Sequence, residues 1–303
     1  MIDLNSKIMS TVKDFETNQF PTWCPGCGDF GIWTALKNAF VEQGLAPHQT
    51  CVVFGIGCSG NMASFLNVYG FHGLHGRSIP VATGIKLANH KLPVVAIGGD
   101  GDGYGIGLGH LIHAMRRNVD ITYVVHNNQI YGLTKGQTSP TSEHGLVTKS
   151  TPFGAIEMPI DPIALAIDVG ATYVARGFSG NAKQLTELII GGMKHKGFAL
   201  IDVMQPCVTY NHLNTFHWFY QRLYELDKEG HDPADKAKAW ARAMEWPTQL
   251  KVDENRVDRI PTGLFYQESR ATYTDELPQL SDQALVEQTL GNIQIEPLMK
   301  KIS

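Results

Sequence analysis

The sequence predicts an α/β fold, a parallel sheet flanked by helices, followed by a C-terminal extension. Apolar runs at 92–97 and 120–126 are separated by a helix-spaced segment at 105–118, and this βαβ order implies parallel strands. A polar residue follows each run, Asp100 after the first and Asn128 after the second. Because ligands bind at the carboxyl ends of the strands in open α/β sheets, both residues are expected at a binding site.

The other elements follow in order along the chain. Residues 31–40 carry apolar side chains at helical spacing. Asp161 is expected to cap a helix that has Pro162 in its first turn. Residues 134–151 are rich in Thr, Ser and Gly, which is typical of a loop over a binding site. We further expect a strand at 51–57, a helix within 79–90, a strand at 172–176, a helix at 181–195 and a strand at 198–203.

The chain is expected to divide into three parts. Residues 1–22 are polar and would form an N-terminal arm, residues 23–207 the ligand-binding domain, and residues 208–303 the extension. Within the extension, residues 210–226 are aromatic and expected to be helical, whereas residues 227–260 are charged and contain several prolines. An aromatic helix on a domain that already has its core favours contact with another chain.

Composition excludes several classes of protein. The 303 residues are 43% hydrophobic, enough for one large α/β domain with or without an extension. A net charge of −4 gives no reason to expect nucleic acid or an anionic membrane surface as a partner. No signal peptide is apparent, and no apolar run is long enough to span a membrane. Together with cysteines that show no disulfide pattern, these features favour the cytoplasm.

The most specific motif is the run Gly98–Gly103 (GGDGDG), followed by the pair Asn127 and Asn128. Asp100 and Asn128 lie 28 positions apart. Oxygen ligands at two strand ends suit Mg²⁺ bound to a diphosphate, and glycines let a backbone approach phosphate oxygens. Each half alone is also a common turn sequence. No glycine triple in the run fits G-x-G-x-x-G, which argues against a dinucleotide site.

Five cysteines form the second pattern: Cys24, Cys27, Cys51, Cys58 and Cys207. The C-x-x-C of Cys24 and Cys27 is compatible with a redox dithiol, half a zinc site or half an iron–sulfur site. An iron–sulfur cluster needs four thiolates, which distant segments can supply. Cys24, Cys27, Cys58 and Cys207 provide four, each in a segment with Gly or Pro. Cys51 begins an apolar strand and is expected to be a buried small hydrophobe.

Together the two patterns resemble one enzyme family. The spacing of Gly-Asp-Gly and Asn-Asn resembles the diphosphate-binding motif of thiamine diphosphate (ThDP) enzymes, which implies the diphosphate-type ThDP domain. With the cysteines, the chain is similar to the β subunits of 2-oxoacid:ferredoxin oxidoreductases from about Trp23 to Cys207. The segments that carry the resemblance are 23–31 (WCPGCGDFG), 55–59 (GIGCS), 75–77 (HGR), 99–102 (GDGD) and 127–137 (NNQIYGLTKGQ).

The resemblance implies a role for each matching residue. It places Mg²⁺ on Asp100, Asn128 and the carbonyl of Ile130, and one 4Fe–4S cluster on Cys24, Cys27, Cys58 and Cys207. The residues expected to bind the cofactor are Ile56, Gly57, Cys58, Ser59, Gly99, Asp100, Gly101, Asp102, Asn128, Tyr131, Gly132, Leu133 and Thr134.

Three residues are expected near the substrate. A cation at Lys135 would hold a distal carboxylate, which favours 2-oxoglutarate over pyruvate. His75 and Arg77 are expected to act in the same way or to contact the diphosphate. Asp102 is expected to stiffen the phosphate loop. We interpret the remaining histidines of this region, His72, His110, His113 and His126, as packing or surface residues.

The implied reaction is the oxidative decarboxylation of 2-oxoglutarate to succinyl-CoA, or its reversal, which fixes CO2. Coenzyme A would receive the acyl group and ferredoxin the electrons. ThDP also needs a glutamate that normally comes from a pyrimidine-binding domain, and this chain has no second α/β domain. We therefore expect an α subunit as partner in an (αβ)2 heterotetramer, with activity only in the assembly.

Four alternatives remain at this stage. Pyruvate is the alternative substrate of the same family. A non-redox ThDP decarboxylase or synthase subunit would contain no iron. An electron-transfer or scaffold subunit would contain iron and no ThDP. A zinc-stabilised α/β protein would be colourless and inactive in redox chemistry.

Overall fold

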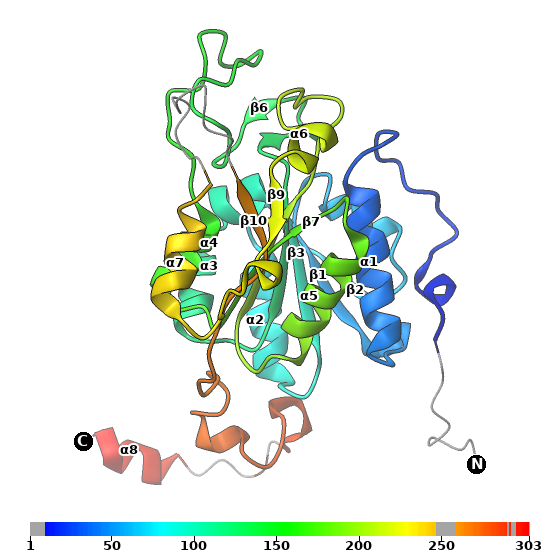
Figure 1. Cartoon of the computed structure of the whole chain (residues 1–303). Helices are drawn as coiled ribbons and strands as arrows, with labels where there is room; N and C mark the ends of the chain where they lie inside the picture. The colour runs from blue at the N-terminus through cyan, green and yellow to red at the C-terminus, as the bar shows by residue number, and fades with distance from the viewer. Residues whose placement is uncertain (1–9, 247–258, 290, 292–294, 303) are drawn as a thin grey trace.

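The chain forms a mostly parallel, eight-stranded sheet covered by helices on both faces (Figure 1). The structure, a computed structural model, describes residues 10–246, 259–289, 291 and 295–302. The strand order is β2-β1-β3-β4-β8-β7-β10-β9, and β5 and β6 form a separate two-stranded sheet. Neighbouring strands of the large sheet are parallel except β7 and β10. The predicted fold class is therefore confirmed.

The element bounds are as follows. The strands are β1 (Cys51–Phe54), β2 (Tyr69–His72), β3 (Val94–Gly99), β4 (Thr122–Asn127), β5 (Ile130–Tyr131), β6 (Gln137–Thr138), β7 (Tyr173–Phe178), β8 (Ala199–Met204), β9 (Leu223–Glu225) and β10 (Ile260–Gln267). The helices are α1 (Asp29–Glu42), α2 (Ser78–Ala88), α3 (Leu108–Arg116), α4 (Pro162–Val169), α5 (Ala182–Lys194), α6 (Phe216–Tyr220), α7 (Lys236–Ala243) and α8 (Glu296–Ile302). Within these bounds, no described helix is long and apolar enough to cross a membrane.

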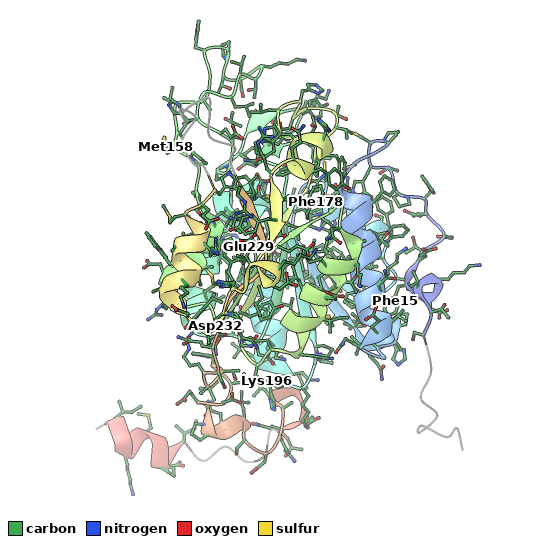
Figure 2. The ribbon with its side chains drawn as sticks, viewed as in Figure 1. Phe15, Met158, Phe178, Lys196, Glu229 and Asp232 are labelled. Atoms are coloured by element: carbon green, nitrogen blue, oxygen red, sulfur yellow. The ribbon has the colours of Figure 1, made fainter. Side chains whose placement is uncertain are left out.

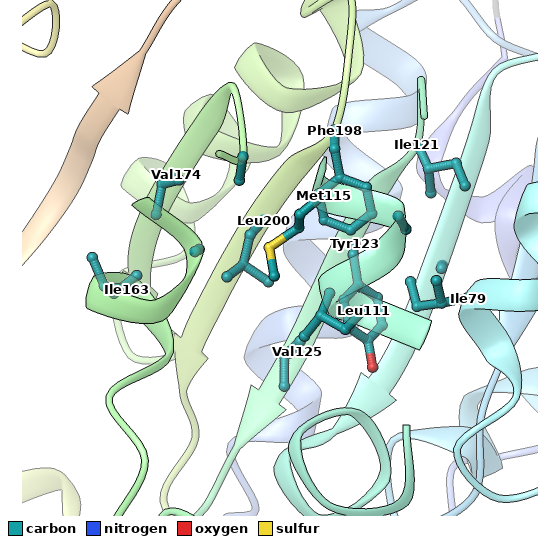
Figure 3. Packing of buried hydrophobic residues seen from close by; sticks show 14 of the residues in the cluster. Ile79, Leu111, Met115, Ile121, Tyr123, Val125, Ile163, Val174, Phe198 and Leu200 are labelled. Carbon is teal, nitrogen blue, oxygen red and sulfur yellow. The ribbon is translucent and has the colours of Figure 1, made fainter. Parts of the chain in front are cut away.

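Two hydrophobic cores lie on opposite faces of the sheet. Successive strand residues point to opposite faces, so Val124 packs with α1 and α5, whereas Tyr123 and Val125 pack with α2, α3 and α4. Figure 3 shows Leu111 and Met115 of α3 against this second core. In Figure 1, α1 and α5 lie to one side of the strands, and α3, α4 and α7 to the other.

Local signals within residues 23–207 led to elements close to those observed. The predicted cap of α4 is confirmed, because one carboxylate oxygen of Asp161 accepts hydrogen bonds from the N–H groups of Ile163 and Ala164, both at 3.0 Å. The predicted helix at 105–118 is split into a π-helical turn, η4 (Gly101–Ile106), and α3. The sequence patterns did not predict the edge strand β2.

The prediction of a helix over residues 210–226 is wrong. Only α6 is helical there, and residues 223–225 form strand β9. β9 pairs with β10, which pairs antiparallel with β7. The aromatic side chains of this region pack partly on their own chain, since Phe219 stacks on Phe178 with ring centroids 5.5 Å apart. This part of the chain therefore extends the main sheet.

The N-terminal residues that the structure describes are anchored to the domain. Phe15 is fully buried and packs against Phe40 of α1, and Glu16 forms an ion pair with Lys37. Residues 1–9 of the predicted arm lie outside the described residues, as do residues 247–258 of the predicted charged segment.

The carboxyl ends of the strands lie together at one end of the molecule. Figure 2 shows Phe178, the last residue of β7, toward the top, and Lys196, which precedes β8, toward the bottom. The two-stranded β5–β6 sheet and α6 lie at the same upper end (Figure 1).

Candidate active site

Four adjacent strands carry the predicted site residues. Cys58 follows β1, Asp100 follows β3, Asn128 follows β4 and Cys207 follows β8. These strands are neighbours in the order β1-β3-β4-β8, and they are parallel. The segments that leave their carboxyl ends therefore meet at one edge, where open α/β sheets bind ligands.

A cavity lies at this edge of the sheet. All thirteen residues predicted to bind a cofactor line it, together with His75 and Ile130. One further residue, His126, completes the lining. The sequence motifs thus converge in space, although their binding roles stay predictions.

Asp100 is a buried carboxylate held by hydroxyl groups. Its Oδ2 accepts hydrogen bonds from the hydroxyls of Ser139 at 2.5 Å and Thr141 at 2.7 Å. Burial raises the pKa of Asp100 to about 6, the hydrogen bonds oppose this rise, and the nearby Asp202 carboxylate adds repulsion. A buried carboxylate is costly unless a cation compensates it, and a divalent cation at the cavity would do so.

The two asparagines face different surroundings. Asn127 turns into the protein, where its Nδ2 donates to Asp202 at 3.0 Å and its Oδ1 lies 2.8 Å from the Thr141 hydroxyl oxygen. Asn128 lines the cavity, and its Oδ1 accepts from the N–H of Ile130 at 3.1 Å. An amide oxygen has a second lone pair, so Asn128 can also bind a metal ion.

The glycines of the GGDGDG run mainly accommodate tyrosines. A Cβ on Gly101 would lie 2.1 Å from the ring of Tyr131, and Cβ atoms on Gly98 and Gly103 would lie 2.3 and 2.2 Å from the hydroxyl of Tyr123. The space beside Gly99 is more open, with the nearest atom 3.6 Å away. Packing against tyrosines therefore explains three of the four glycines, and the approach of a phosphate to this run stays a prediction.

Asp102 joins three segments of the cavity wall. Its Oδ1 accepts the N–H of Ile56 at 3.0 Å and that of Gly76 at 2.7 Å. The Nδ1 of His75 lies 3.0 Å from the same oxygen. The carboxylate thus ties the segment after β1 and the segment before α2 to the turn after β3.

Turn and loop contacts bring the cysteine segments together. The N–H of Cys27 donates to the carbonyl of Cys24 at 2.9 Å, and Gly26 between them has a φ of 80°, a conformation that glycine adopts without strain. The next N–H, of Gly28, donates to the carbonyl of Pro206 at 3.2 Å. The indole of Trp23 donates to the carbonyl of Cys58 at 2.8 Å.

Cys58 lies within electrostatic reach of Cys24, Cys27 and Cys207. Burial raises the pKa of Cys58 to about 12, and the charges of Asp29, Cys207 and Cys24 add to the rise. Burial also raises the pKa of Cys27, with contributions from Asp29 and Cys58. A Cβ on Gly132 would lie 3.4 Å from the sulfur of Cys58 and 3.7 Å from that of Cys207. Cys51 packs in the core, as predicted.

Two family models match consecutive parts of the chain. Residues 55–203 match the thiamine pyrophosphate enzyme C-terminal TPP binding domain, and residues 207–282 match the C-terminal part of the pyruvate ferredoxin oxidoreductase beta subunit.

Full-length relatives match across nearly the whole sequence. The beta subunit of 2-oxoacid:ferredoxin oxidoreductase 1 from Aeropyrum pernix is 46% identical over 88% of this chain and 85% of its own. The chain is a β subunit of the 2-oxoacid:ferredoxin oxidoreductase family. The 2-oxoglutarate synthase subunit KorB of Archaeoglobus fulgidus is 44% identical to this β subunit, covering 87% of this chain and 91% of its own.

A solved structure agrees with the fold of this β subunit. The 2-oxoglutarate:ferredoxin oxidoreductase of Magnetococcus marinus, with 2-oxoglutarate, coenzyme A and succinyl-CoA bound, superposes with a TM-score of 0.87. The identity is 36%, and the match covers 99% of this chain and 98% of that chain. The predicted family is thus confirmed.

The three predicted substrate residues of this β subunit are placed differently relative to the cavity. Arg77 is exposed and its guanidinium contacts His110. Lys135 is exposed, has a φ of 77° and follows the lining residue Thr134. Neither is among the described residues that line the cavity, whereas His75 is. Their substrate contacts stay predictions.

The structure adds residues to the site that sequence patterns missed. Ser139 and Thr141 hold Asp100 from the predicted loop at 134–151. His126, interpreted as a packing or surface histidine, is buried, contacts Asp29 and lines the cavity. Its place at the end of an apolar strand, two residues before Asn128, was the one sequence signal available.

Proposed function

We propose that this β subunit catalyses the CoA-dependent oxidative decarboxylation of 2-oxoglutarate to succinyl-CoA, or the reverse reaction, together with an α subunit. ThDP, Mg²⁺ and one 4Fe–4S cluster would be its cofactors, and ferredoxin its electron partner. The observation that carries the proposal is the convergence of the GDGD, Asn-Asn and cysteine motifs at one edge of the sheet.

The residues at the cavity fit a Mg²⁺–diphosphate group. Asp100 and Asn128 present oxygens from neighbouring strand ends, and Ile130 follows on the same turn. Such hard oxygen ligands are those that Mg²⁺ prefers. When bound, ThDP supplies an electron sink for loss of CO2 from a 2-oxoacid. Ser139 and Thr141 hold Asp100 through their hydroxyls, and they would thereby fix its geometry as a metal ligand.

The cysteines fit an iron–sulfur cluster by their number and by the position of Cys58, which lies within electrostatic reach of the other three. A 4Fe–4S cluster is held by four thiolates, and we assign these to Cys24, Cys27, Cys58 and Cys207. Metal binding would also stabilise the thiolates, because ligation requires deprotonated sulfur.

The names of the relatives support 2-oxoglutarate as substrate. Relatives from Archaeoglobus fulgidus and Mycobacterium tuberculosis are named as 2-oxoglutarate enzymes, and the Magnetococcus marinus structure contains 2-oxoglutarate. The name of the family model at 207–282 instead refers to pyruvate, which keeps pyruvate as the second candidate. We assign Lys135 to the distal carboxylate of 2-oxoglutarate, because it follows the cavity-lining residue Thr134 and is exposed.

A partner subunit would complete the site. The curated relatives are themselves named as β subunits, which supports an α subunit and an (αβ)2 assembly. We also propose that residues 23–207 hold the cofactors and that residues 208–303 form the extension. The five free thiols favour a reducing cytoplasm as the location.

The proposal is tested by an anaerobic absorbance spectrum of the chain with its co-purifying partner, before and after 2-oxoglutarate plus coenzyme A. We expect a broad brown absorption that bleaches on addition. A brown protein that responds to pyruvate instead would move the substrate to the second candidate. A colourless protein would contradict the redox function and leave a non-redox ThDP enzyme.

The substrate assignment is tested by Lys135→Ala. We expect kcat/KM for 2-oxoglutarate to fall at least tenfold more than kcat/KM for pyruvate, because only the larger substrate has the second carboxylate. Arg116→Ala, on an exposed side chain of α3, is the control for general loss of surface charge. An equal loss on both substrates would remove Lys135 from the specificity site.

A further inference from the structure

His126 is a buried histidine between the cysteine segments and the cavity. It lies near the end of β4 with an exposed fraction of 1%. Its Nδ1 lies 2.6 Å from Oδ1 of Asp29, the first residue of α1, which is fully buried. This contact fixes the orientation of the imidazole ring, because a histidine with one nitrogen held by a carboxylate presents the other in a fixed direction.

The other ring nitrogen of His126 has no hydrogen-bond partner among the residues that the structure describes. This Nε2 atom is buried, yet the residue lines the cavity. Ser59 lines the same cavity, and its buried Oγ is also without a partner. That oxygen lies 3.6 Å from the position of a Cβ on Gly99. Buried polar atoms are nearly always hydrogen-bonded, so two unpaired ones on one cavity indicate a polar ligand.

Asp29 also links His126 to the cysteine turn. Its second carboxylate oxygen, Oδ2, accepts from the thiol of Cys27 at 3.3 Å. One carboxylate therefore contacts both a proposed cluster ligand and the histidine that faces the cavity. The position of the His126 ring therefore depends on a carboxylate that also contacts the cysteine turn.

We propose that His126 contacts the cofactor, with its Nε2 hydrogen-bonded to a polar atom of the bound ThDP, and that Asp29 is the positioning residue for the ring. The inference rests on the proposed function, because it requires ThDP in the cavity. It adds a contact that the GDGD and Asn-Asn motifs do not include.

Two amide substitutions separate the roles of the two ring nitrogens. In His126→Gln the amide reaches about as far as Nε2, whereas in His126→Asn it reaches about as far as Nδ1. The measurement is the Kd of ThDP in saturating Mg²⁺, by anaerobic titration calorimetry on the chain with its co-purifying partner. Iron content and the thermal midpoint are measured on the same samples.

We expect His126→Asn to lower the affinity for ThDP and His126→Gln to lower the thermal stability. His126→Asn keeps a donor for Asp29 but loses the group at Nε2, so ThDP should bind about 10- to 100-fold more weakly with little change in thermal midpoint. His126→Gln should bind ThDP within about threefold of the unsubstituted chain but unfold at a lower temperature, since Asp29 loses its buried partner. Asp29→Asn should retain affinity, because its amide oxygen still accepts from Nδ1.

Several outcomes would overturn the inference. If His126→Gln bound ThDP more weakly than His126→Asn, then ThDP affinity would simply follow thermal stability. His126 would then be a structural partner of Asp29 only. Unchanged affinity in both variants, or an equal loss in both, would also exclude the Nε2 contact. Asp100→Asn serves as the reference for lost ThDP binding. If the unsubstituted chain bound no ThDP, the proposed function itself would fail, a result separate from those of the His126 variants.

Discussion

The side of the cavity that carries Asp100 and the side next to the cysteine segments are held by different interactions. On one side Asp100 and Asn127 are held by the hydroxyls of Ser139 and Thr141 and by the carboxylate of Asp202. On the other side the thiols rest on turns, and burial raises the pKa of Cys58 to about 12. Protein hydrogen bonds order the first side before a ligand arrives, whereas the proposed cluster would be needed to stabilise the thiolates of the second. The comparison teaches that the proposed magnesium side is preorganised, whereas the proposed cluster side would be completed only by its metal.

The largest effect is expected on the cysteine side. Cys207→Ala should lose the brown chromophore and the bound iron, because a four-thiolate cluster loses one ligand. Iron content and absorbance measure this. Cys51→Ala is the matched control and should retain iron. Cys51 is buried in the core at the start of β1, whereas the cavity lies at the carboxyl end of that strand. Full iron in Cys207→Ala would remove this residue from the cluster.

On the preorganised side, Asp100→Asn should weaken ThDP binding in Mg²⁺ by about 100-fold or more, since loss of a supporting partner already costs 10- to 100-fold. The iron content should not change, because the hydroxyls of Ser139 and Thr141, and not the cysteine segments, hold Asp100. Calorimetric titration with ThDP and an iron assay on one sample make both measurements. A parallel loss of iron would break the comparison by showing that the two sides form one unit.

Packing of the glycine run predicts an effect on stability. Gly103→Ala places a Cβ 2.2 Å from the Tyr123 hydroxyl, and such overpacking costs about 1–3 kcal/mol. Thermal or urea unfolding measures the change. Gly84→Ala is the control, because Gly84 lies in α2 and no atom of the described residues outside its own helix backbone lies within 4 Å of its Cβ position. This substitution should stabilise the chain by about 0.5–1 kcal/mol. Equal stability of the two variants would mean that the run is loosely packed.

The smallest effect is expected at Thr141. Thr141→Val keeps the shape of the side chain but removes the hydrogen bond to Asp100, and ThDP should bind about tenfold more weakly. Thr148→Val is the control for the loss of a hydroxyl, because among the described residues the Thr148 hydroxyl bonds within its own loop. If both variants bind ThDP like the unsubstituted chain, Asp100 does not need its hydroxyl partners and the magnesium side is not preorganised by them.

The two halves of the chain also differ in how well sequence patterns predicted them. Between residues 23 and 207, apolar runs and caps such as Asp161 are local signals, and the strands and helices they predict are present. Beyond residue 207, the aromatic pattern at 210–226 indicated a helix, but it includes strand β9. β9 and β10 are stabilised by pairing with strands distant in sequence, and strand formation of this kind depends on its neighbours.

The sequence by itself determined the family, the strand-end motifs and the residues that line the cavity, apart from His126. These are local, because each motif is a short segment placed by the strand before it. Only the tertiary structure decided which hydroxyls hold Asp100, that Asn127 faces Asp202, and that Asp29 reaches His126 across 97 positions. Such contacts join side chains from separate elements, and their pairing depends on how α1, the sheet and the 134–151 loop pack together.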